Sequence, residues 1–171
     1  MSTNTHWLDL GLEALPEPRA ERVRLFRVLL AAATQLRGRL DRELAPSGLT
    51  SPQATLLHAI EVQPQAPTMS VVARALGMTH QNVKQIALVL ERKGFIEIAV
   101  DPLDRRARRL HLTPHHHRFW QQRNPGDFSS VEAWTSVLSD SEVRTAVRLL
   151  SKLRDELRGE GLAQEQEQEQ E

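Results

Sequence analysis

The chain has 171 residues, and its 22 lysines and arginines balance its 22 aspartates and glutamates, so the formal net charge is zero. Taken as a whole, this balance argues against a simple polyelectrolyte that coats nucleic acid. An apolar fraction of 40% is enough to form a core, and the length fits one domain or a small module with appended helices. The absence of cysteine excludes disulfides, thiolate metal sites and thiol nucleophiles.

No segment has the features of a membrane span or a secretory leader. The longest apolar run, residues 28–33, is far below the roughly 20 residues that cross a bilayer. The first residues lack a basic stretch followed by an apolar one, which a secretory signal needs. We therefore expect a cytoplasmic protein without membrane contact.

The zero net charge conceals a gradient along the chain. Residues 1–65 are balanced, residues 66–124 hold ten basic and four acidic side chains, and residues 125–171 hold five basic and eleven acidic ones. The middle segment therefore carries +6 and the last one −6, and five of the seven histidines also lie in the middle segment. Such an uneven charge distribution is typical of proteins that bind nucleic acid, although solvated helix faces produce charge runs as well.

The N-terminal part is expected to be helical. A leucine-containing arm, residues 1–16, is predicted to pack on a helix over residues 18–44, where apolar residues recur at steps of three and four. The turn-forming residues 45–48 end this helix. Ser51, acting as an N-cap before a proline, opens a short helix over residues 51–61.

The next segments change from helical to strand periodicity. Helices are predicted over residues 68–76 and 79–93, each with a threonine N-cap and a glycine at its end. The second of them has one apolar and one polar face. Residues 95–100 and 109–113 then alternate with a period of two around a polar turn, which predicts a β-hairpin with a basic tip.

The C-terminal part returns to helix. Threonine and proline open a helix over residues 113–122, and the Asn-Pro-Gly-Asp sequence at 124–127 is expected to interrupt it before helix resumes over 128–138. A capping box opens a last helix over 139–159. The alternating Gln/Glu tail, 160–171, has nothing to bury and is predicted to be disordered or frayed helix.

The order of the predicted elements is typical of a winged helix-turn-helix: helix, turn, helix, strand, basic loop and strand. Amide side chains on the outer face of the second helix suit base edges, basic ones suit phosphates, and arginines at a hairpin tip suit a narrow minor groove. The candidate DNA-binding residues are Thr79, His80, Gln81, Asn82, Lys84, Gln85, Arg105, Arg106 and Arg108.

The predicted fold is mainly α with a small hairpin wing, and the winged module is flanked by helices at both ends. The predicted divisions are 1–48, 49–113, 114–159 and 160–171. The module of residues 49–113 is small enough to be marginal alone, and a two-fold pair of chains would bury the apolar stripes of the flanking helices. We therefore expect a homodimer.

Residues 49–113 resemble the MarR-type bacterial transcription regulators. The stretches that carry the resemblance are Leu49-Thr50, Val72-Ala73, Leu76-Gly77-Met78-Thr79, Leu90-Glu91-Arg92-Lys93-Gly94-Phe95-Ile96, Asp101-Pro102-Leu103-Asp104-Arg105-Arg106 and Leu112-Thr113. The resemblance implies a homodimer joined through helices 18–44 and 128–159, a palindromic site on double-stranded DNA, repression more than activation, and often a small-molecule inducer. It also implies that Arg106 enters the minor groove and that Asp104 braces the wing by pairing with an arginine.

This chain departs from the family pattern in two places. Leu88 and Val89 stand where the recognition helix commonly has a polar or charged pair, so a winged-helix module that binds protein through this face, without specific DNA binding, is the alternative function. The second departure is the helix after the wing, which has histidines at 115–117 where a glycine is usual and a Pro-Gly pair midway.

Two further patterns have a plain and a specific interpretation. Adjacent helical side chains point about 100° apart, so the histidines 115–117 are not expected to converge on one ion, and neither a metal nor a cofactor is predicted. The aromatic residues of the same region are expected to pack in the core or an interface more readily than to line an inducer pocket. These residues are Phe119, Trp120, Phe128 and Trp134. No phosphate-binding glycine loop or nucleophile elbow is present, so an enzyme is not expected.

Overall fold

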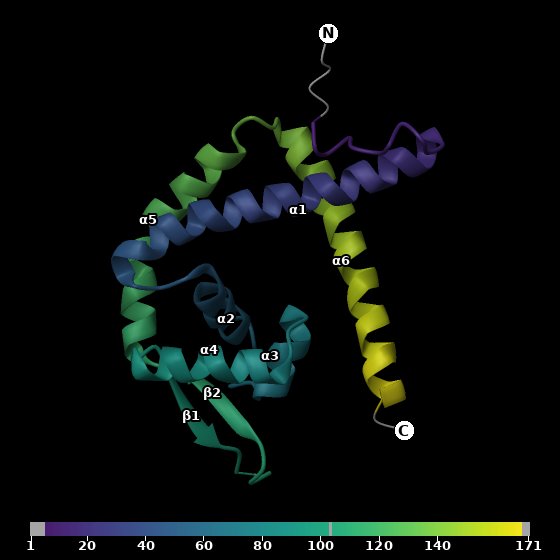
Figure 1. Ribbon diagram of the computed structural model, residues 1–171. Helices are drawn as coiled ribbons and strands as arrows, with labels where there is room; N and C mark the ends of the chain where they lie inside the picture. The colour runs from purple at the N-terminus through teal and green to yellow at the C-terminus, as the bar shows by residue number, and fades with distance from the viewer. Residues whose placement is uncertain (1–5, 103, 169–171) are drawn as a thin grey trace. The chain divides into compact units, whose positions relative to one another are not determined.

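The computed structural model describes residues 6–102 and 104–168, so residues 1–5 of the predicted arm, Leu103 in the expected wing and residues 169–171 of the predicted tail lie outside the described residues. The chain divides into two compact units, Met1–Ser51 and Pro52–Glu171. Helices dominate, and the described strands form one two-stranded antiparallel sheet (Figure 1). The predicted fold class, mainly α with a hairpin wing, is confirmed, while the predicted four-part division stays a prediction.

The first unit is built on one long helix. Helix α1 spans Glu17–Leu44 and passes into a short 3-10 helix, Ala45–Ser47, which ends at Gly48 with a φ of 67°. Because only glycine adopts this left-handed conformation without strain, Gly48 fixes the point at which the helical path ends. The predicted helix and its break are both confirmed.

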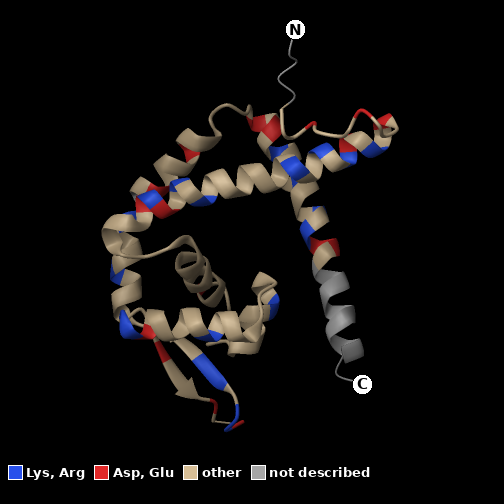
Figure 2. Cartoon of the chain, in the orientation of Figure 1, with Lys and Arg blue, Asp and Glu red and all other residues tan. Residues whose placement is uncertain are grey.

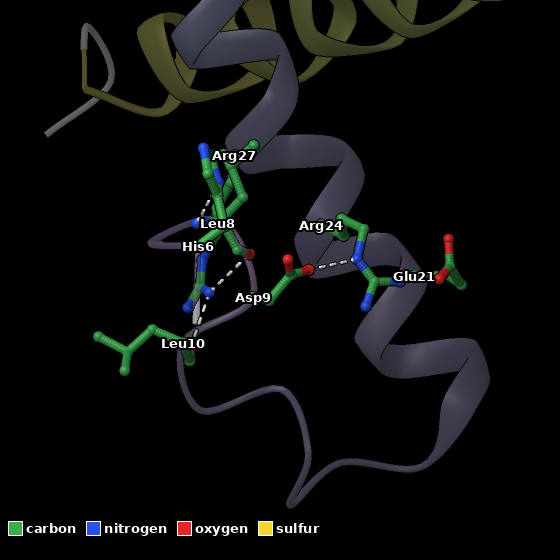
Figure 3. Close-up of polar contacts among 7 residues, drawn as sticks. All are labelled: His6, Leu8, Asp9, Leu10, Glu21, Arg24 and Arg27. Carbon is green, nitrogen blue, oxygen red and sulfur yellow. Dashed lines mark hydrogen bonds and ion pairs between the residues drawn. The ribbon is translucent and has the colours of Figure 1, made fainter. Parts of the chain in front are cut away.

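The N-terminal arm is held on α1 by arginines (Figure 3). Arg24 Nε lies 2.8 Å from Asp9 Oδ1, and this hydrogen bond raises the pKa of Arg24. Arg27 Nη1 donates to the carbonyl oxygens of Leu8, at 3.0 Å, and Leu10, at 2.8 Å. The described part of the arm, from residue 6 on, therefore packs on the helix as predicted, and polar contacts contribute to its attachment.

The second unit opens with three helices, α2 (Ser51–Glu61, beginning one residue before the unit), α3 (Met69–Leu76) and α4 (His80–Arg92). The predicted N-caps of α3 and α4 are confirmed, because the threonine hydroxyl before each helix accepts a backbone N–H of its first turn. Ser51 differs from its predicted role: the helix already includes it, and its buried hydroxyl has no partner among the described residues. Its own N–H donates to Asp41 Oδ1 at 2.6 Å, so Asp41 provides the cap expected from the serine.

The core of the second unit lies between these helices and the hairpin. Strand β1 (Ile96–Val100) pairs with β2 (Arg108–Leu112), with Ile96 opposite Leu112 and Ile98 opposite Leu110. Fully buried side chains from α2, α3, α4 and both strands fill the core. They are Leu56, Leu57, Val72, Val83, Leu90, Ile96 and Leu110.

Helix α5 spans Pro114–Thr135 without interruption, so the predicted break at residues 124–127 is wrong. A proline inside a helix removes one hydrogen bond, and a helix tolerates this loss by bending. Arg123 and Asp127 bridge the proline with an i,i+4 ion pair of 2.9 Å, which holds the flanking turns together. Figure 1 shows α5 as one helix that changes direction along its length.

Helix α6 spans Asp140–Gln168 and extends past the predicted end near residue 159 into the Gln/Glu tail. Its predicted capping box is confirmed: Ser139 N–H donates to Glu142 Oε2 at 2.8 Å, and Glu142 N–H donates to Ser139 Oγ at 3.4 Å. These bonds lower the pKa of Glu142. Within residues 6–102 and 104–168, no helix combines the length with the apolar content that a membrane crossing requires.

Thr113 joins the wing to α5, and its removal tests this junction. Its hydroxyl accepts the N–H of His116 at 3.3 Å and lies 2.6 Å from the Gly94 carbonyl oxygen, so it caps α5 and ties it to the end of α4. We expect Thr113→Ala to lower the free energy of unfolding by about 1–2 kcal/mol, measured by urea denaturation. Thr55→Ala, an exposed position inside α2, is the control; an equal loss in both variants would contradict this role.

Candidate nucleic-acid interface

Helix α4 presents its predicted polar face to solvent. Val83, Ala87 and Leu90 are fully buried, which fixes the rotation of the helix. The six predicted positions of α4 and its cap are exposed. They are Thr79, His80, Gln81, Asn82, Lys84 and Gln85. The amide groups of Gln81 and Gln85 therefore lie on an outer surface, where they can each donate and accept at a base edge.

The hairpin places the second group of predicted residues. Figure 1 shows β1 and β2 projecting beyond α4, and Figure 2 shows basic residues along β2 and near the turn. Arg105, Arg106 and Arg108 are exposed, as the prediction requires. Arg108 Nη1 donates to the carbonyl oxygens of Arg105, at 2.9 Å, and Ala107, at 3.1 Å, so this guanidinium also shapes the turn.

An ion pair lies where the strands of the wing meet the turn. Arg109 Nε lies 2.6 Å from Asp101 Oδ2, and the Asp101 side chain is 5% exposed against 28% for Arg109. Arg109 Nη1 also donates to the Ala66 carbonyl oxygen at 2.7 Å, while Leu110 N–H donates to the Pro67 carbonyl oxygen at 2.9 Å. One arginine therefore connects the two strands to the segment that leads into α3.

The predicted pairing of Asp104 with an arginine side chain is replaced by a different bond. Asp104 Oδ1 accepts the backbone N–H of Arg106 at 2.9 Å, and Asp104 N–H donates to Asp101 Oδ1 at 3.3 Å. Asp104 thus shapes the turn, while Asp101 forms the ion pair. Spacing along the chain did not distinguish the two aspartates, because the choice depends on which carboxylate the hairpin register places beside Arg109.

The recognition helix and the wing are coupled directly. Glu91 Oε1 accepts the N–H of Ile98 at 2.9 Å, and the N–H of Phe95 donates to the Leu90 carbonyl oxygen at 3.0 Å. Glu91 was not among the predicted site residues, because its partner is a backbone N–H of β1 and no side-chain pattern indicates such a bond. These bonds fix the position of α4 relative to β1, so a ligand that contacts both elements meets a preformed surface.

Comparisons with known proteins find similar sequences and folds. Residues 47–107 match the model of the MarR family. The chain is similar to a MarR protein from Peptoclostridium difficile, with 17% identity, a TM-score of 0.74, and 81% of this chain and 90% of that one covered. It is similar to MepR of S. aureus, solved with DNA, with 25% identity, a TM-score of 0.66, and coverage of 78% and 95%. It is also similar to BpsR of Bordetella bronchiseptica, whose DNA binding is regulated by 6-hydroxynicotinic acid, with 22% identity, a TM-score of 0.69, and coverage of 77% and 98%.

Residues 47–107 thus match the MarR family, and the chain has the fold of MarR-type winged helix proteins.

The departure from the MarR pattern at Leu88 and Val89 gives α4 a small apolar area. Leu88 is 44% exposed, whereas Val89 is half-buried. A single exposed leucine is ordinary on a protein surface and does not form a contiguous patch. It does, however, stand beside the amide face, where it can contact a thymine methyl group.

The aromatic residues at the start of α5 pack against one another and against neighbouring rings. Phe119 meets Phe95 edge-on with centroids 5.2 Å apart, and Trp120, 5% exposed, lies 4.8 Å from the ring of His58. Phe128 is 64% exposed, so the four predicted aromatics do not close around one cavity. Packing, the favoured interpretation, accounts for Phe119 and Trp120.

One polar cluster was not expected from the sequence. His116 and His117 on α5 place a ring nitrogen each near a carboxylate oxygen of Glu61 on α2, and all three atoms lie within 4.8 Å of one another. His116 is fully buried, which lowers its pKa to about 4 and keeps the imidazole neutral near pH 7. The argument that adjacent histidines diverge overlooked a third ligand from another helix, and no spacing within 115–117 indicated it.

The wing ion pair allows a sharp test. We expect Asp101→Asn to lower the free energy of unfolding by about 2 kcal/mol, because it leaves a partly buried guanidinium without its countercharge. Asp104→Asn is the matched control, since its amide oxygen still accepts the Arg106 N–H, and we expect a change below about 0.5 kcal/mol. Urea denaturation of both variants measures this; equal losses would show that Asp101 has no special role.

Proposed function

We propose that this protein binds a palindromic site on double-stranded DNA as a homodimer in the cytoplasm and represses transcription there. The observation that carries the proposal is the exposed amide face of α4 fixed beside an exposed pair of wing arginines. A recognition helix in the major groove and a wing in the minor groove use these two surfaces together. DNA binding by this fold is supported by MepR, a protein of similar fold that has been solved in complex with DNA.

The distribution of charge along the chain also supports DNA binding through α4 and the wing. Residues 66–124 carry a net charge of +6 and include α3, α4 and the wing. Lysine and arginine side chains that neutralise phosphates release counterions, so binding through this segment falls steeply as salt rises. The Thr79 cap adds the N-terminus of α4, whose free N–H groups favour a phosphate oxygen.

The homodimer is supported by apolar surface on the two long helices. On α1, Leu25, Phe26 and Leu30 are each more than half exposed. On α6, exposed apolar residues recur at steps of three and four. They are Val143, Val147, Leu150, Leu153 and Leu157. Such stripes on long helices are buried when two helices pack, and a second copy of the chain supplies the matching surface.

Release of the protein from DNA by a small molecule is supported by BpsR, a protein of similar fold whose DNA binding is regulated by a ligand. A hollow of about 270 Å³ in the first unit is lined by Trp7, Leu30, Ala31, Thr34 and Gln35. Ligand sites typically enclose roughly 300–1,000 Å³, so this hollow is small for such a role. We assign no inducer to it.

The alternative function, protein binding through Leu88 and Val89, predicts a different response. A protein partner docked on an apolar anchor is insensitive to the amide groups of α4 and only weakly sensitive to salt. The half-buried Val89 leaves Leu88 as the sole large anchor of this pair, which favours the DNA interpretation.

In vitro selection from random double-stranded DNA tests specificity and symmetry together. We expect a palindromic site with half-sites one helical turn, about 34–36 Å, apart, bound with an affinity that falls steeply with salt. No enrichment of any sequence, or a flat salt dependence, would favour the protein-binding alternative.

Two variants distinguish base-specific contacts from charge-based binding to DNA of any sequence. Arg106→Ala should weaken binding to all sequences, because the arginine contacts the groove through its charge. Gln85→Ala should cost roughly 1–3 kcal/mol on the selected site and relax its base preference. Arg144→Ala on α6 and Gln121→Ala on α5 are the matched controls, both exposed. Unchanged selection profiles in Gln85→Ala would show that α4 does not read bases.

The dimer is tested by placing a charge in the α6 stripe. Wild-type protein should have twice the 19.4 kDa mass of one chain, and Leu150→Asp should shift it toward the mass of one chain, measured by light scattering. A buried carboxylate without a partner is costly, so the variant disfavours association. Thr145→Asp adds the same charge about 140° away on the helix and should leave the mass unchanged. A wild-type protein of 19.4 kDa would contradict the dimer.

A further inference from the structure

Three ligand-bearing side chains outside the proposed DNA surface converge where α2 ends and α5 begins. Glu61 is the last residue of α2, and His116 and His117 lie in the first turn of α5. One ligand atom of each, a carboxylate oxygen and two ring nitrogens, lies within 4.8 Å of the other two. More than fifty positions of sequence separate Glu61 from the histidines, so the fold itself brings the three together.

His116 is the residue that points to a ligand. Its side chain is fully buried, and neither ring nitrogen has a hydrogen-bond partner among the described residues. Buried polar groups in folded proteins are nearly always paired, and leaving one unpaired costs about 1–3 kcal/mol. The nearest rings, His117 with centroids 5.1 Å away and Trp120 at 6.4 Å, meet it edge-on and accept no bond in the structure.

We propose that Glu61, His116 and His117 bind a divalent transition-metal ion, with Zn²⁺ as the best fit. Imidazole nitrogen and carboxylate oxygen are both zinc ligands, and a set of three protein ligands leaves one position for water or another donor. Harder ions such as Mg²⁺ and Ca²⁺ prefer oxygen ligands, so two histidines select against them. A bound ion would satisfy the buried imidazole that the protein leaves without a partner.

The geometry allows the site to close. Zinc bonds to nitrogen and oxygen of about 2.0–2.2 Å place tetrahedral ligand atoms about 3.4 Å apart, so the cluster must contract from its present limit of 4.8 Å. His116 is held by packing, whereas Glu61 and His117 are exposed and can change rotamer at little cost. The buried histidine thus fixes the position of the ion, and the two exposed residues complete the shell.

A neighbouring histidine supports the carboxylate. His58 Nδ1 lies 3.5 Å from Glu61 Oε2, one turn earlier on α2, and the His58 ring packs 4.8 Å from Trp120. A partner of this kind orients a metal-binding carboxylate and is typical of metal sites in proteins. The ion would join α2, in the core of the winged module, to the helix that leaves the wing. This site and its test do not depend on DNA binding.

Competition for Zn²⁺ against a chromogenic chelator tests the site in full-length, untagged protein. We expect wild-type protein to bind one ion per chain, and Glu61→Gln and His117→Ala each to weaken the affinity at least tenfold. His111→Ala, which removes an exposed histidine from β2, is the matched control and should bind as the wild type does. Circular dichroism of each variant establishes that it is folded.

Two readouts make the result decisive. Co²⁺ in place of Zn²⁺ should give the strong visible absorption of a tetrahedral site in the wild type and in His111→Ala only. Added Zn²⁺ should raise the melting temperature of these two proteins and not that of His117→Ala, because an ion that binds only the folded state stabilises it. Equal Zn²⁺ affinity in wild type, Glu61→Gln and His117→Ala would overturn the proposal.

Discussion

The wing depends on one partly buried arginine. Arg109 pairs with Asp101 at 2.6 Å across the hairpin and donates to the Ala66 carbonyl oxygen, so it connects β1, β2 and the segment before α3. A two-stranded hairpin is marginal in water by itself, and these bonds join it to a helical core. The position of every exposed arginine near the turn follows from this anchor, because the hairpin register determines where the turn begins. Function at the tip therefore rests on a charge pair at the point where the strands meet the turn.

Helix α4 is likewise held in place by contacts away from its exposed face. One face of the helix is buried and the other is exposed. Val83, Ala87 and Leu90 fix its rotation by packing, and Glu91 fixes its distance from β1 through the Ile98 N–H. With rotation and distance both determined, the amide face and the wing act as one rigid surface. Rigid surfaces lose less conformational entropy on binding than mobile ones, which favours specific recognition.

The helices, the caps and the hairpin could be predicted from the sequence because each depends on residues close together in the chain. Thr79 and Thr113 cap the helices that directly follow them, and the glycine after α3 marks its end through its own conformation. The failures involve contacts through space. The continuity of α5 past its proline, the choice of Asp101 over Asp104, and the approach of Glu61 to His116 all depend on which partner the fold supplies. Local patterns predict elements well and predict their side-chain partners poorly.

The zero net charge takes on a different meaning once the elements are placed. Six surplus positive charges belong to residues 66–124, which form α3, α4, the wing and the first half of α5, and six surplus negative charges belong to residues 125–171. Non-specific binding to DNA grows with the number of phosphates that a protein neutralises, so a uniformly basic chain is held at many wrong sites. A neutral chain with one basic surface attracts DNA mainly to that surface, where contacts to the bases distinguish one sequence from another. The rest of the protein attracts DNA less. Charge balance therefore supports the proposed specificity, although the total alone argued only against a polyelectrolyte that coats nucleic acid.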